Sequence, residues 1–188
     1  MKGLPLLLLL LLLGSCSKNY TPVREYVALP VKYPKEKISH PSNDFSMTIP
    51  QNWFWKSERY ESEKMMLGIT AAFSETTRGY TQIISVYKYR SLQKNATLYK
   101  EYESSRKYHE DKATLEMVES GKTKLNNYDA YFMHLQSTNE NPIEIITFLV
   151  KGKEQGVFYS ITANGQLKDE PKTNMAIMVK CLNSFEYN

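Results

Sequence analysis

The segment LEMVESGKTKLNNYDAYFMHLQSTNENPIEIITFLVKGKEQGVFYSITA, residues 115–163, decides the fold because it repeats one pattern four times. Each repeat is a run rich in β-branched, aromatic and aliphatic side chains, which is typical of a strand. The runs cover residues 115–125, 128–137, 143–150 and 157–163, and the polar segments NNYD, NENP and KGKEQG separate them. Because short polar connections join antiparallel neighbours, the segment predicts a four-stranded antiparallel meander.

Three further strand patterns precede this meander. DFSMTIPQNW, residues 44–53, alternates apolar and polar side chains up to Pro50, as expected of a half-buried strand. MMLGITAAF (65–73) and YTQIISVYKYR (80–90) are strand-like runs, and SETTRG between them contains turn-forming residues. The latter two runs therefore predict a hairpin.

Two segments have a helical period instead. Pro171 fits the first turn of a helix that ends near Phe185, in which Cys181 lies on the apolar side and is expected to be buried. The other helix is expected over residues 97–112, with Asn95 or Thr97 as its cap. Its inward side carries Leu98, Tyr102, Ser105 and His109.

The segment from residue 42 to residue 188 is therefore expected to be a single α+β domain, an antiparallel sheet of about six to seven strands with two main helices packed on it. Its motifs FSMTIPQNW, YDAYFMHLQ, GVFYSITAN and the terminal CLNSFEY resemble those of the PsbP/Mog1-like group. The resemblance implies the same architecture and no catalytic residues. The chain departs from the group's pattern at Asn127 and Tyr128, where a glycine usually precedes the Ala-Tyr-like pair.

The leader has the layout of an export signal. Lys2 precedes eight consecutive leucines, and Gly14 and Ser15 precede Cys16. This apolar run is shorter than the roughly 20 residues that cross a bilayer. LGSC, residues 13–16, resembles the lipobox of bacterial lipoproteins, which implies removal of residues 1–15 and lipidation of Cys16.

The resemblance to lipoproteins also predicts where the protein lies. Several acyl chains on Cys16 would give a stable membrane anchor. Ser17 stands where an Asp would favour retention in the inner membrane, so the expected location is the cell envelope at the outer membrane, in its periplasmic leaflet or at the cell surface.

Residues 16–41 contain four prolines and no glycine, which predicts an extended tether between the anchor and the domain. The stretch VREYVALPVKY within it is apolar for a linker. Part of it is therefore also open to docking on the domain as an edge strand, where proline is tolerated.

Charge and histidine content argue against several classes of site. The net charge is +4, and runs such as KYPKEK and ESSRKYHEDK mix both signs, unlike a nucleic-acid-binding face. His40, His109 and His134 show no paired ligand spacing, so we expect no metal and no cofactor.

Three patterns in the sequence resemble catalytic or nucleotide-binding motifs. SGKT, residues 120–123, has the end of a phosphate-binding P-loop, but Glu116 stands where the P-loop needs glycine. SVYK, residues 85–88, has the spacing of a Ser-x-x-Lys nucleophile and base. In the predicted strand, however, Ser85 and Lys88 point to opposite faces. A pair of carboxylates for glycoside hydrolysis stays open because their separation is spatial. Glu144 is the one acidic residue in a strongly apolar strand, a pattern that predicts an exposed face. The sequence thus predicts a protein without enzymatic activity.

Aromatic residues supply the candidate binding surface. Tyr87 and Tyr89 share one face of their strand, and with Trp55 they form the expected partner or ligand surface. The alternative is that these rings pack the sheet beneath its helices.

Two functional hypotheses follow. The first is a lipid-anchored envelope module that binds a protein partner or stabilises an assembly, motivated by the leader and by the lack of a catalytic motif. The second is a small-ligand or glycan-binding domain, or a hydrolase without a recognisable motif, in an aromatic-lined pocket. Neither hypothesis includes nucleic acid as a partner.

Overall fold

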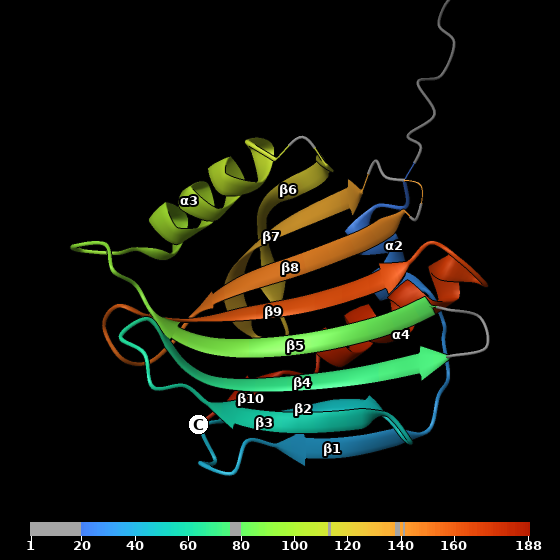
Figure 1. Cartoon of the computed structure of the whole chain (residues 1–188), viewed down its shortest axis with the longest axis horizontal. Helices are drawn as coiled ribbons and strands as arrows, with labels where there is room; N and C mark the ends of the chain where they lie inside the picture. Colours follow the sequence, from blue (N-terminus) through green and yellow to red (C-terminus); the bar gives the residue numbers. More distant parts are fainter. Residues whose placement is uncertain (1–19, 76–79, 113, 138–139, 141) are drawn as a thin grey trace, which may run out of the picture.

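The computed structural model describes residues 20–188 except residues 76–79, 113, 138–139 and 141. Most of the domain is built on one antiparallel sheet. Its strands are β3 (Phe54–Arg59), β4 (Met65–Glu75), β5 (Tyr80–Arg90), β6 (Leu115–Leu125), β7 (Tyr128–Ser137), β8 (Ile143–Lys151) and β9 (Val157–Gln166). Their order is β3-β4-β5-β9-β8-β7-β6, so the predicted meander is formed and its last strand pairs with the predicted hairpin (Figure 1).

A smaller sheet lies beside the first. It contains β1 (Lys35–Ser39), β2 (Phe45–Pro50) and β10 (Glu186–Tyr187) in the order β1-β2-β10. The strand predicted at residues 45–49 therefore belongs to this sheet, and β3 completes the seven strands of the large one. The α+β class with helices packed on an antiparallel sheet is confirmed.

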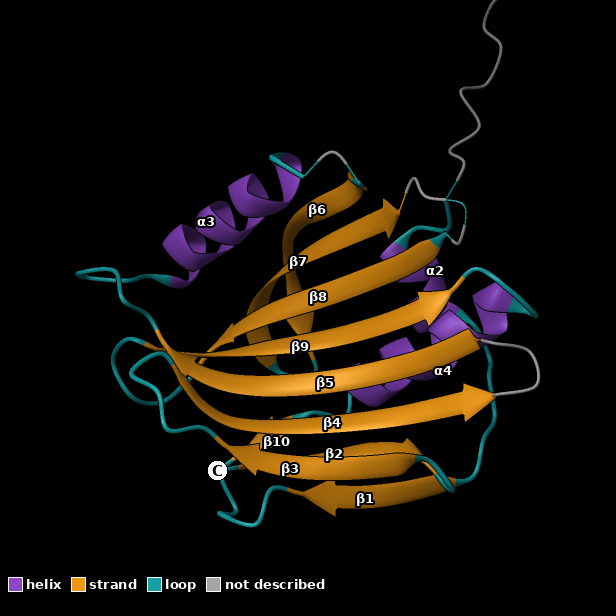
Figure 2. Ribbon diagram, viewed as in Figure 1, coloured by secondary structure: helices purple, strands orange, loops and turns teal. Residues whose placement is uncertain are grey.

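The helices are distributed unequally over the two faces of the large sheet. They are α2 (Val23–Ala28), α3 (Leu98–Glu110) and α4 (Pro171–Leu182). α4 packs on β9 and β5 with α2 beside it, and α3 packs on the other face against β6, β7 and β8. On that second face no described helix covers β9, β5 and β4 (Figure 2). The sheet thus presents an open surface next to α3.

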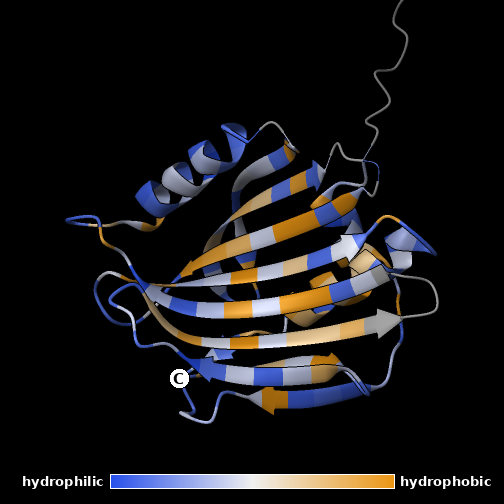
Figure 3. Ribbon diagram, viewed as in Figure 1, coloured by the Kyte–Doolittle hydropathy of each residue, from blue (hydrophilic) through white to orange (hydrophobic). Residues whose placement is uncertain are grey.

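Burial follows this division. The main core lies between the large sheet, α4 and the small sheet, and a smaller cluster of Tyr102, Met133, Leu135 and Leu149 lies under α3. Figure 3 shows alternating polar and apolar bands across the open face of the sheet. Cys181 is fully buried, as predicted.

The expected start of the first main helix is confirmed at its cap. Thr97 is the N-cap of α3, and its Oγ1 accepts a hydrogen bond from the Lys100 amide at 3.2 Å. The hydroxyl therefore satisfies one of the backbone donors that a helix start leaves without an intrahelical partner.

The segment before residue 42 is not simply extended. Residues 23–28 form a helical turn because Val23 and Tyr26, three residues apart, then share one side and are buried on the domain. Residues 35–39 pair with β2 as an edge strand. The described part of the predicted tether, residues 20–41, therefore runs along the surface of the domain.

Candidate functional site

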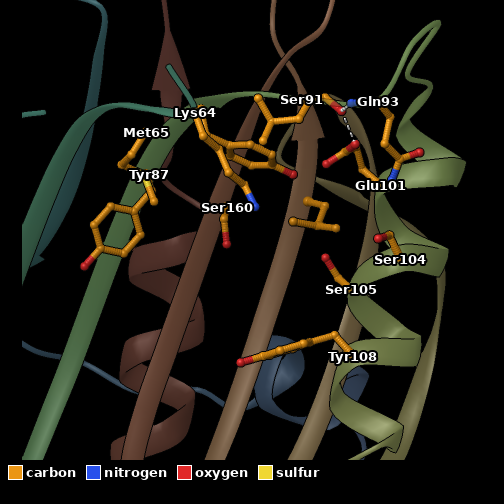
Figure 4. Close-up of a pocket in the computed structure, with 13 residues that line it drawn as sticks. Lys64, Met65, Tyr87, Ser91, Gln93, Glu101, Ser104, Ser105, Tyr108 and Ser160 are labelled. Atoms are coloured by element: carbon orange, nitrogen blue, oxygen red, sulfur yellow. Dashed lines mark hydrogen bonds between the residues drawn. The ribbon is translucent and has the colours of Figure 1, made fainter. Parts of the chain in front are cut away.

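A cleft lies between α3 and the open part of the sheet (Figure 4). Its volume is about 640 Å³, within the range of pockets that hold small ligands. Hydroxyl groups and tyrosine rings dominate its lining, which includes Tyr87, Tyr89, Ser91, Ser104, Ser105, Tyr108 and Ser160.

Strand register and helix period bring these groups together. Tyr87 is opposite Ser160 on β9, which is opposite Leu149 on β8, so the three side chains share the face toward α3. On the helix, Glu101, Ser105 and Tyr108 follow one another at spacings of four and three residues, which places them on one side. The sheet therefore forms the floor of the cleft, and α3 forms one wall.

Glu101 links the wall that α3 forms to the end of β5. The side chain is only 8% exposed, and its carboxylate accepts a hydrogen bond from the Ser91 hydroxyl. Burial, followed by the nearby Glu101 carboxylate, raises the pKa of Tyr89 well above its usual range. Tyr89 therefore keeps its proton and serves as a donor to that carboxylate.

The structure brings two of the three predicted site residues together. Tyr87 and Tyr89 both line the cleft, although Tyr89 is only 7% exposed. Trp55 is opposite Ala71, which is opposite Ile84 on β5. Since Ile84 and Tyr87 are an odd number of residues apart, Trp55 lies on the other face of the sheet. The three rings do not form one surface.

Cys16, the predicted lipidation site, lies outside the described residues. The helix wall of the cleft was missed, apart from Ser105, which was expected on the inward side of its helix. The spacing of Glu101, Ser105 and Tyr108 was the available signal.

A second polar group is buried on the opposite face of the sheet, under α2. Glu144 is 1% exposed and His134 is fully buried, and Glu144 Oε1 lies 2.6 Å from His134 Nε2. The Tyr26 hydroxyl donates to the same carboxylate at 2.8 Å. The expectation that Glu144 marks an exposed face is wrong, because α2 covers this part of the strand.

The same buried group also holds α2 through its backbone. Glu119 Oε2 accepts a hydrogen bond from the Val23 amide at 3.0 Å and lies 3.8 Å from His134 Nδ1. Burial, then the Glu144 carboxylate, raises the pKa of Tyr26 above its usual range, so Tyr26 remains a donor. This arrangement ties residues 23–26 to the sheet.

The cleft offers hydroxyl groups, tyrosine rings and two charged side chains, Lys64 and Glu101. None of its described lining residues is a histidine or cysteine. Across the described part of the chain, no group of three or more His, Cys, Asp or Glu side chains is placed to hold a metal ion. No helix among the described residues is both long and apolar enough to cross a membrane.

Comparison with known proteins relates the chain to others through its fold. No protein-family model matches the sequence, and no curated protein matches it. Among solved structures, the Ran-binding protein Mog1p of Saccharomyces cerevisiae superposes with a TM-score of 0.57 at 9% identity, over 83% of this chain and 96% of that one. Cyanobacterial PsbP (CyanoP) of Synechocystis sp. PCC 6803 gives 0.51 at 11% identity, over 85% and 95%.

Two bacterial structures are also similar. LpqN of Mycobacterium tuberculosis gives a TM-score of 0.50 at 11% identity, over 88% of this chain and 95% of that one. A Bacteroides thetaiotaomicron structure gives 0.52 at 9% identity, and the match spans only 49% of its length, against 84% of this chain. At these identities the likeness establishes the shared fold, as the resemblance to the PsbP/Mog1-like group implied.

Proposed function

We propose that the protein is a lipid-anchored, non-enzymatic binding module of the bacterial cell envelope, and that its ligand occupies the cleft between α3 and the sheet. The lipobox-like LGSC motif supports the anchor. LpqN, which shares the fold, is described as involved in cell envelope biogenesis. The cleft itself carries the binding proposal, because its concave lining combines three tyrosine rings with four serine hydroxyl groups.

The lining favours a small polar ligand of glycan type. Sugars present hydroxyl groups around the ring and apolar C–H faces, and the serines and tyrosines of the cleft match these two features. The cleft of about 640 Å³ accommodates one or two sugar rings rather than a folded partner.

A protein partner is the second candidate, at a different place. On β3, an edge strand of the large sheet, Phe54 is 83% exposed on one face and Trp55 is 40% exposed on the other. Exposed aromatic residues on an edge strand are typical of protein interfaces. A photo-crosslinker at Phe54, compared with one at Leu92 on the cleft rim, would distinguish the two surfaces by which of them captures a protein in cells.

Replacing Cys16 with alanine is expected to abolish lipidation. The only other cysteine is Cys181, which is buried, so C181A is the matched control. Cells fed an alkyne-bearing palmitate should label the wild-type chain and C181A, but not C16A. Equal labelling of C16A would disprove the proposed anchor.

Filling the cleft is expected to abolish glycan binding. In S105W the indole would occupy the space between α3 and the sheet, whereas K107W places the same ring on an exposed position of α3. Calorimetric titration with chitobiose and maltose should show binding to the wild-type chain and K107W, and at least about tenfold weaker binding to S105W. If both variants bind equally, the ligand site lies elsewhere.

A further inference from the structure

Another, shallower pocket lies at the start of α3, where Thr97, Leu98 and Tyr99 contribute to its lining. Its volume is about 650 Å³, and it shares no lining residue with the cleft. The end of β8, the turn after it, β6, the start of β7 and β10 all contribute. Its lining includes Lys122, Lys151 and Lys153 together with Tyr99, Tyr128, Tyr131 and Tyr187.

The register of the sheet places the lysines on one side. Lys122 is opposite Tyr131, which is opposite Leu149, so Lys122 lies on the face toward α3. Lys151 follows Leu149 by two residues on β8 and lies on the same face. Lys153 comes from the turn that follows. All three lysines are exposed, so their ammonium groups are accessible from solvent.

Like most lysines in the described part of the chain, none of the three forms an ion pair, whereas Lys37, Lys56, Lys88 and Lys172 do. Asp129 is the one acidic residue in the described lining. The described lining therefore carries three positive side chains against one negative one, which leaves an excess of positive charge.

The tyrosines give this charged pocket rigid walls. The rings of Tyr128 and Tyr187 stack with centroids 4.5 Å apart, and Tyr131 stacks on Tyr102 at 4.7 Å. The Tyr187 hydroxyl donates to the Lys151 carbonyl at 3.0 Å, which fixes the backbone beside the lysine. Tyr99 is half exposed and offers a ring face at the rim. The positive end of α3 points to the same place and adds to the attraction for an anion.

We propose that this pocket, named here the lysine pocket, binds an anionic group, phosphate or carboxylate, carried on a sugar or on a lipid headgroup. Three ammonium groups around one cavity recognise such a group through charge-assisted hydrogen bonds. The adjacent tyrosine faces accommodate the ring or glycerol unit that carries it. This site is separate from the proposed glycan cleft, so either site can fail its test without the other.

The test compares two triple variants of the full chain in a zwitterionic detergent. K122Q/K151Q/K153Q removes the cations of the lysine pocket, and K37Q/K56Q/K172Q removes the same total charge elsewhere. Calorimetry with glucose 6-phosphate and with glucuronate reports the sugar-borne anion, and dihexanoyl phosphatidylglycerol reports the lipid headgroup. Glucose and dihexanoyl phosphatidylcholine are the probes without net charge.

We expect the wild-type chain and the control triple variant to bind at least one anionic probe and the lysine-pocket variant to bind it at least about tenfold more weakly. Added salt should weaken this binding because the site is exposed. The probe that binds identifies the source of the anion. No saturable binding by about 10 mM of any anionic probe, or an equal loss in both triple variants, would overturn the proposal.

Discussion

Replacing Glu144 with alanine is expected to lower the free energy of unfolding by about 3 to 5 kcal/mol. The Glu144 carboxylate is the common acceptor for the Tyr26 hydroxyl and for His134 Nε2, and both Glu144 and His134 are buried. Its removal deprives the Tyr26 hydroxyl and His134 Nε2 of the acceptor that they share, and both side chains are buried. The cost is therefore larger than that of losing one surface ion pair.

Urea unfolding of the full chain measures this effect, and two variants calibrate it. E144Q retains an acceptor for Tyr26 and should lose about 1 to 2 kcal/mol. E186A removes an exposed carboxylate that lies 3.5 Å from Lys37 Nζ, and it should change stability by less than about 0.5 kcal/mol. A loss for E144A as small as that for E186A would show that the buried contacts do not hold the segment around α2.

Local sequence patterns predicted most of the large sheet. The meander of β6 to β9 and the β4–β5 hairpin follow from alternation and turn residues, because neighbouring strands joined by short turns pair with each other. The placement of β2 did not follow. β2 pairs with β1, which was not predicted as a strand, and with β10 near the chain's end, and the second of these pairings is long-range and leaves no local signal.

The lining of the cleft between α3 and the sheet was predicted only in part. Alternation correctly puts Tyr87 and Tyr89 on one face of β5, since that depends on local geometry alone. Whether Trp55 joins them depends on which residue of β4 it opposes, and a shift of one residue would reverse its face. The α3 wall depends on how the helix docks, which the sequence does not specify.

The buried group under α2 was missed because its members are far apart in the chain. Tyr26 and Glu144 are separated by 118 residues, and an apolar strand with one carboxylate has the same pattern whether that face is exposed or covered. Only the helical turn of residues 23–28, packed against α4, distinguishes the two cases. Proline content favoured an extended segment there, and the burial of Val23 and Tyr26 outweighed that preference.

The second large effect is expected at Phe185, where the two sheets and α4 meet. Phe185 is fully buried, and its ring lies 5.2 Å from Tyr159 and 6.1 Å from Phe45, centroid to centroid. The preceding Ser184 accepts a hydrogen bond from the Thr48 amide at 2.8 Å, which joins the end of α4 to β2. The Ser-Phe pair thus connects the small sheet to the main core.

We expect F185A to lower the free energy of unfolding by about 3 to 5 kcal/mol, because it removes a buried ring and leaves a cavity among aromatic neighbours that cannot all close in. F54A removes the same side chain from a position that is 83% exposed and should change stability by less than about 0.5 kcal/mol. Both are measured by urea unfolding with tryptophan fluorescence. Comparable losses in the two variants would mean that Phe185 contributes no more to packing than an exposed residue, and that the small sheet is held to the core by other contacts.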